Sequence, residues 1–154
     1  MSQSLAKILL HAVFSTKDRF PFLQNTAIRE EVHAYLGGIP EKLDCHAMAV
    51  GGVSDHVLLL FSFARVETVA AVTKELKRSS SAWVKTKSPA MKKFAGQSGY
   101  GVFSIGFSQT KAVQAYIAGQ ERRHRKLSLQ DEMRSFCGAT RLISTSATSG
   151  TKAA

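Results

Sequence analysis

One short stretch carries part of the residue pattern of a divalent-metal site. In SDHVLLLFSF (54–63), His56 precedes Leu58 by two positions, and residues two apart on a strand point to the same face. A second histidine at position 58 would complete a two-imidazole clamp for a cation, but the chain has leucine there. The stretch therefore predicts either a metal-binding strand that has lost one ligand or an ordinary buried strand with one histidine.

A second stretch, AVQAYIAGQERRHRK (112–126), supplies other groups that such chemistry uses. Tyr116 and Gln120 are four residues apart, so they lie on one face of a helix. Tyrosine can form covalent intermediates, and an amide oxygen suits a hard cation. The basic residues that follow are suited to phosphate binding: Arg122, Arg123, Arg125 and Lys126. A plain amphipathic helix with Tyr116 in its core is the alternative interpretation.

Other groups are poor substitutes for the missing ligand at position 58. His124 lies two helical turns beyond Tyr116, roughly 12 Å along the axis. Asp55 should alternate to the strand face opposite His56. His11, in the first apolar run, is expected to be a core or surface residue. The candidate metal ligands are therefore His56 and Gln120, with Tyr116 as the candidate nucleophile.

The charge balance favours a polyanionic partner. The 154 residues include 21 Lys and Arg against 11 Asp and Glu, a formal net charge of +10. Such an excess makes nucleic acid the first candidate. A predicted helix over 66–85 and the residues just after it carry candidate phosphate contacts, with a solvated face as the alternative: Lys74, Lys77, Arg78, Lys85 and Lys87.

The apolar patterning predicts one α+β domain. Strands are expected over 5–15, 45–50, 56–63 and 101–107, with a turn at 51–55. Helices are expected over 26–36, 66–85 and 110–125, and a short one over 128–137. The order β-α-β-β-α-β-α is that of a ferredoxin-like or RRM-like sandwich with an added C-terminal helix. The domain should occupy residues 1–137, and the Ser- and Thr-rich residues 138–154 should be a disordered tail.

The sequence gives no indication of secretion or membrane insertion. The N-terminal apolar run lacks a small-residue cleavage site, and no apolar stretch is long enough to span a bilayer. The two cysteines, Cys45 and Cys137, form no CxxC pair, so neither a zinc site nor a disulfide scaffold is indicated. A cytoplasmic protein without membrane partners is expected.

Taken together, five stretches in order resemble the single-tyrosine HUH transposases, the insertion-sequence and REP-associated tyrosine transposases. They are LLHAVFSTKDR, AVGGVSDHVLLLFS, KELKRSSSAWVKTK, GYGVFSIGFS and YIAGQERRHRKLSLQDE, spanning roughly residues 5 to 136. The family's His-hydrophobic-His motif is similar to His56-Val57-Leu58, with the second histidine absent. Its nucleophile matches Tyr116, and its metal-binding glutamine matches Gln120.

The resemblance implies a DNA strand-cleavage reaction. A Mg²⁺ or Mn²⁺ ion would polarise the scissile phosphate of single-stranded DNA, and tyrosine would attack to give a 5′-phosphotyrosine and a free 3′-hydroxyl. Reversal on a new end would rejoin the strands. Family members are homodimers that bind DNA hairpins at element ends, and the tyrosine helix of one subunit often completes the site of the other.

Two other functions compete with an active transposase. Leu58 is consistent with a catalytically inactive relative that binds hairpin DNA without cutting it. A single-strand RNA-binding module is the other, because SGYGVFSI (98–105) is close to the RNP1 pattern. RNP1 requires two aromatic side chains on one open sheet face, whereas Tyr100 and Phe103 should point to opposite faces.

Overall fold

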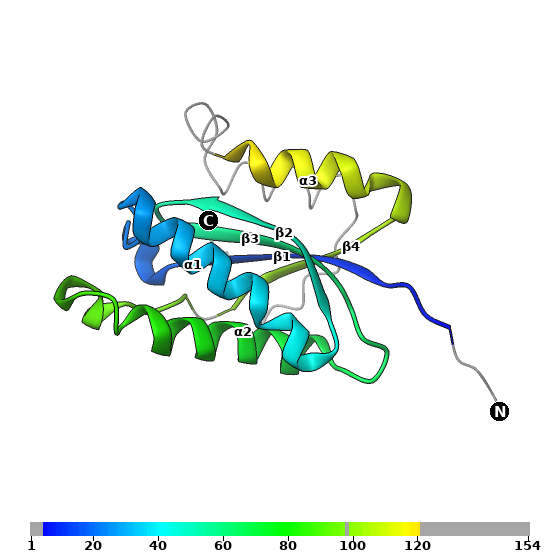
Figure 1. Cartoon of the computed structure of the whole chain (residues 1–154), viewed down its shortest axis with the longest axis horizontal. Coiled ribbons are helices and arrows are strands. Elements are labelled where there is room, and N and C mark those ends of the chain that lie inside the picture. Colours follow the sequence, from blue (N-terminus) through cyan, green and yellow to red (C-terminus); the bar gives the residue numbers. More distant parts are fainter. Residues whose placement is uncertain (1–4, 98, 121–154) are drawn as a thin grey trace, which may run out of the picture.

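A four-stranded antiparallel sheet with helices on both faces forms the framework of the protein (Figure 1). The computed structural model describes residues 5–97 and 99–120. The elements are β1 (Leu9–Ser15), α1 (Thr26–Gly38), β2 (His46–Val53), β3 (His56–Ser62), α2 (Val69–Val84), β4 (Gly101–Ile105) and α3 (Thr110–Ala118). The strand order β2-β3-β1-β4 is that of the ferredoxin-like sandwich, so the predicted fold class is confirmed. The predicted helix over 128–137 and the predicted tail over 138–154 lie outside the described residues.

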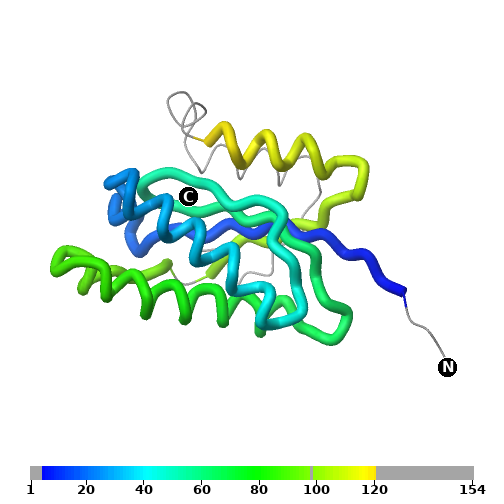
Figure 2. Tube along the Cα trace, in the orientation of Figure 1, coloured from blue at the N-terminus to red at the C-terminus, as the bar shows by residue number. Residues whose placement is uncertain are grey.

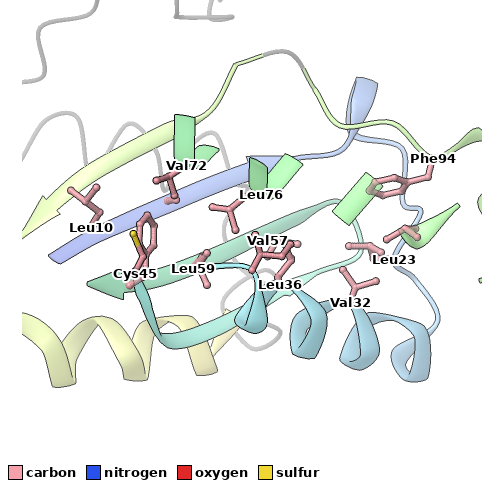
Figure 3. Packing of buried hydrophobic residues seen from close by; sticks show 14 of the residues in the cluster. Leu10, Leu23, Val32, Leu36, Cys45, Val57, Leu59, Val72, Leu76 and Phe94 are labelled. Carbon is pink, nitrogen blue, oxygen red and sulfur yellow. The ribbon is translucent and has the colours of Figure 1, made fainter. Parts of the chain in front are cut away.

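The alternation of side chains along the strands divides the core into two layers. On one face, alternate residues of β1 and β3 pack under α1 and α2, and this larger cluster includes Leu10, Val57 and Leu59 (Figure 3). On the other face, Leu58 and Leu60 pack with residues of β1 and β4 and with α3. Among the described residues, Figure 2 shows α3 on this side of the sheet, opposite the α1–α2 layer. The period of two thus directs His56 and Leu58 toward the tyrosine helix.

The turn of the β2–β3 hairpin lies later in the chain than Gly51 and Gly52, where the sequence predicts it. The sequence predicts a turn over 51–55, but β2 continues to Val53, and Gly51 and Gly52 pair with Leu58 and Val57. These glycines instead allow other parts of the backbone to approach closely. A Cβ on Gly51 would lie 2.6 Å from the carbonyl oxygen of Ile117 in α3. The absence of a side chain at Gly51 therefore lets α3 pack directly on the sheet.

Helix and strand ends differ from the predicted ones by a few residues. The Asn25 side chain caps α1 by accepting from the Ile28 N–H, and Thr68 caps α2, which starts later than predicted. β1 starts at Leu9 instead of Leu5, because its partners end opposite that residue. No helix within the described residues combines the length and apolar character needed to cross a bilayer.

Candidate active site

His56 lies at the start of β3 with a fully buried ring. Its Nδ1 is 2.7 Å from Oδ1 of Asp55, and because an ionised carboxylate only accepts, Nδ1–H is the donor. The other ring nitrogen, Nε2, faces Gln120. Pairing of one ring nitrogen with a carboxylate is the arrangement that orients histidine ligands in metal sites.

Asp55 is placed differently from the sequence prediction. It belongs to the turn before β3, so strand alternation does not apply, and its carboxylate reaches back to His56 instead of pointing to the opposite face. Arg19, after β1, donates from Nε and a terminal nitrogen to Oδ2 at 3.3 and 3.2 Å. Burial alone would raise the pKa of Asp55, but His56 and Arg19 outweigh it and hold this pKa below its usual value.

Gln120 meets His56 although 64 residues separate them. Its Nε2–H donates to the backbone oxygen of Tyr116 at 3.2 Å, and its Oε1 lies 3.2 Å from Nε2 of His56. With Nδ1 of His56 protonated, two acceptor atoms converge, and they repel each other unless a proton or a cation lies between them. The fold therefore brings two of the predicted site residues, His56 and Gln120, together.

Leu58 offers no donor and is well packed. It is 1 % exposed, pairs with Val13 of β1 and Gly51 of β2, and belongs to the cluster under α3. His11 cannot replace it: Ser15 pairs with His56 and His11 with Leu60, so the two imidazoles start about 13 Å apart along the strands.

The two remaining donors still fit a water-rich ion. The described residues contain no group of three His, Cys, Asp or Glu side chains able to hold a metal. Mg²⁺ commonly keeps several water ligands and takes only one or two from protein. His56 Nε2 and Gln120 Oε1 supply a nitrogen and an oxygen donor, so these residues fit Mg²⁺ or Mn²⁺ held mostly by water.

The Tyr116 ring contacts a residue whose importance the sequence did not indicate. Its edge packs against the His11 ring at 6.1 Å between centroids and 83° between planes. His11 is fully buried, and loss of hydration lowers its pKa to about 4. The tyrosine ring thus packs against a neutral imidazole. That imidazole belongs to His11, four residues along β1 from Ser15, which is the residue that pairs with His56. The even spacing of His11 and Val13 was the signal that could have placed His11 on the α3 face.

Several of the predicted DNA-binding cations on α2 have protein partners. Lys77 donates from Nζ to the carbonyl oxygens of Gln97 and Gly99, and Arg78 pairs with Glu75 at 2.9 Å. Lys87 pairs with Glu31 of α1 at 2.8 Å and lies over the ring of Trp83, which stacks on Tyr35. Lys74 and Lys85 are exposed. The remaining predicted cations, Arg122, Arg123, Arg125 and Lys126, lie outside the described residues.

The RNA-binding alternative lacks the open sheet face that it requires. Phe103 is 4 % exposed and packs in the cluster with α3, while Val102 packs on the α1–α2 side. Base stacking on an RRM-like sheet uses aromatic side chains on an uncovered face. Both faces of this sheet carry helices (Figure 1), so the RNP1-like stretch contributes to the core instead.

Asp55→Asn should weaken cation binding, because Asp55 acts on the cation through the His56 ring. The amide can still accept from Nδ1–H, but it removes the negative charge that raises the basicity of the ring. We expect Mn²⁺ affinity, measured by calorimetry, to fall by about tenfold to a hundredfold. Asp44→Asn, at an exposed position, is the matched control and should leave affinity unchanged. Equal Mn²⁺ affinities in wild type and Asp55→Asn would show that Asp55 does not orient a ligand.

Comparison with known proteins identifies the family of the chain and supports the fold. The sequence profile described as "Transposase IS200 like" matches residues 4–120. A putative transposase from Deinococcus radiodurans R1 superposes with a TM-score of 0.60 at 20% identity, covering 78% of this chain and 98% of the other. A REP-associated tyrosine transposase bound to a REP hairpin gives 0.54 at 13% identity, covering 80% and 74%. No match was found among curated proteins. The profile match over most of the sequence shows that the chain belongs to the IS200-like transposase family.

Proposed function

We propose that the protein cleaves and rejoins single-stranded DNA through a covalent bond to Tyr116. The observation that carries this proposal is the convergence of His56 Nε2 and Gln120 Oε1 at 3.2 Å. Both groups lie beside the helix that carries the tyrosine, on the face of the sheet opposite α1 and α2. Mg²⁺ or Mn²⁺ bound there would neutralise charge on the non-bridging oxygens of the scissile phosphate.

The residues of this chain have separate roles in the proposed reaction. The Tyr116 oxygen attacks phosphorus, the bond to the 3′-oxygen breaks, and the leaving oxygen takes up a proton as a 3′-hydroxyl. Because an unperturbed tyrosine has a pKa of about 10, the phenol must lose its proton as it attacks. Arg19 and Asp55 orient His56, and the Tyr116 carbonyl orients the amide of Gln120. The phosphotyrosine conserves the energy of the phosphodiester, so rejoining requires no nucleotide cofactor.

The substrate we propose is hairpin DNA at the ends of a mobile element, bound by a homodimer. The REP-associated neighbour was solved with a REP hairpin, which supports this substrate class. The Tyr116 ring packs on His11 of β1, and the proposed homodimer would deliver the phenol to the site of a second subunit. The net charge of +10 suits the polyanionic substrate.

A covalent-adduct assay tests the proposed reaction. Purified protein is mixed with single-stranded hairpin DNA from the flanks of its own gene and Mn²⁺, and an SDS-resistant protein–DNA band is sought. We expect a band in the wild type and none in Tyr116→Phe, because phenylalanine has no nucleophilic oxygen. Tyr35→Phe, on α1, is the matched control and should keep the band. A band that persists in Tyr116→Phe would overturn the assignment of the nucleophile.

Buried Leu58 favours one second candidate, a transposase relative that binds hairpin DNA without cutting it. Leucine at a fully packed position lowers the number of metal donors to two. In that case the wild type would give no band, Leu58→His would give one, and hairpin binding would be the same in both proteins.

A further inference from the structure

A cavity of about 540 Å³ lies on the face of the sheet opposite α3. It extends between α2, the segment before β4 and the adjoining ends of β1 and β3, and it reaches His56. Its inner wall is apolar and includes Leu23, Val57, Leu76, Val84 and Phe94. Figure 3 labels four of them: Leu23 from the segment before α1, Val57 from β3, Leu76 from α2 and Phe94 from the segment after α2. Neither the fold nor the proposed cleavage chemistry accounts for a cavity at this position.

Two aromatic rings lie at the side of the cavity next to β4. Val13 pairs with Gly101, so Phe14 and Tyr100 are neighbours across β1 and β4, and their rings are 6.5 Å apart at 53°. Tyr100 is 40 % exposed although it is aromatic. An exposed ring beside an apolar cavity is suited to stacking against a nucleobase.

Cations line the same cavity along α2. Lys74, Lys77 and Arg78 all contribute to its lining. The contacts of Lys77 with the carbonyls of Gln97 and Gly99 fix this loop against α2. Lys74 is exposed, and Arg78, although it pairs with Glu75, keeps two-thirds of its side chain in solvent. The site therefore combines an apolar interior with positive charge at its edge, which is complementary to a base joined to a phosphate.

We propose that this cavity, the α2 pocket, binds one unpaired nucleotide of the DNA strand, with the base inside and its phosphate at Lys74 and Arg78. This inference rests on the proposed single-stranded DNA substrate. His56 borders the pocket from β3, but its ring lies on the α3 face, so the bound nucleotide and the scissile phosphate would lie on opposite faces of the sheet. The α2 pocket would accept only a base that is free of a partner, so it would favour single-stranded over paired DNA.

Binding of a base can be separated from binding of phosphates with two oligonucleotides. One is labelled single-stranded dT of eight nucleotides, and the other is an abasic strand of the same length and charge. Both are titrated by fluorescence anisotropy against full-length Tyr116→Phe protein in EDTA, so that no cleavage occurs. We expect dT to bind about tenfold more tightly than the abasic strand, as one or more stacked bases would give.

Filling the pocket should remove this preference. Ser81→Phe places a ring inside the lining, whereas Ala82→Phe alters the next residue, which is exposed and does not line the pocket. We expect Ser81→Phe to bind both strands equally and Ala82→Phe to keep the tenfold preference.

Ala70→Phe at the pocket edge, with Ala71→Phe as its control, repeats the comparison at an exposed position that tolerates a larger side chain. Lys74→Ala should weaken both strands by the same factor.

Two results would overturn the inference: equal binding of dT and the abasic strand by the parent protein, or an undiminished preference in both filled variants. The adduct assay keeps this failure distinct from failure of the proposed function. A Tyr116-dependent band without a base preference would remove the α2 pocket and leave the cleavage reaction. A base preference without a band would leave the α2 pocket and remove the cleavage reaction.

Discussion

Leu58→His is expected to raise the affinity of the protein for Mn²⁺ by about a hundredfold, the effect of adding one imidazole to a water-exposed ion. The new side chain would leave β3 on the same face as His56, two residues further on, toward α3. It would give a third protein donor beside His56 Nε2 and Gln120 Oε1. Isothermal titration of wild type and variant with Mn²⁺ measures the change.

The same substitution should destabilise the metal-free protein. Leu58 is 1 % exposed among apolar side chains, and burying an imidazole without partners costs about 1–3 kcal/mol. In EDTA we therefore expect urea unfolding of Leu58→His at lower denaturant than wild type, with recovery when Mn²⁺ is added. A variant that only loses stability, with no response to Mn²⁺, would exclude position 58 from the metal site.

Leu59→His is the matched control for both measurements. Leu59 is the next residue of β3, is fully buried and packs on the opposite face of the sheet, where it pairs with Ala12 and Val50. Its substitution should cost comparable stability, because the same kind of polar group is buried. It should neither tighten Mn²⁺ binding nor recover stability with Mn²⁺, since position 59 points away from the face that carries His56.

Local pattern predicted the strand and helix that carry the site, but tertiary contacts decided how the site is built. The period-two alternation of β3 correctly put His56 and Leu58 on one face, which the structure shows to be the face under α3. The contact between His56 and Gln120 joins distant segments and depends on the close packing of α3 on Gly51. The sequence predicts a turn at that glycine, because local preference cannot distinguish a turn glycine from one that admits a neighbouring backbone.

The supporting residues were the least predictable part of the site. Strand alternation predicts that Asp55 points to the face opposite His56, but Asp55 lies in a turn, where its carboxylate folds back onto the next residue. Arg19 adopts a positive φ of 56° after β1, and nothing in the local sequence indicates that its guanidinium meets Asp55. Such contacts depend on loop geometry, which hydrophobic periodicity does not describe.

Acid should destabilise the protein through His11. Burial lowers the pKa of this imidazole from 6.5 to about 4, so between these values the unfolded chain binds a proton that the folded protein does not. The stability from neutral His11 is thus fully present above pH 6.5 and is lost as the pH falls toward 4. From pH 7 to pH 4 the free energy of unfolding should fall by roughly 3 kcal/mol on this account. Urea titrations at half-unit pH steps measure the slope.

His11→Leu should flatten this slope, because leucine fills a similar volume and has no proton to bind. His46→Gln is the control, since it also removes one imidazole, but from a side chain that is 70 % exposed. The low pKa of Asp55 makes its own contribution disappear only below its ordinary value of 3.8, outside this window. If His11→Leu keeps the slope of the wild type, the imidazole is charged in the folded protein, and the Tyr116 ring then packs against a cation.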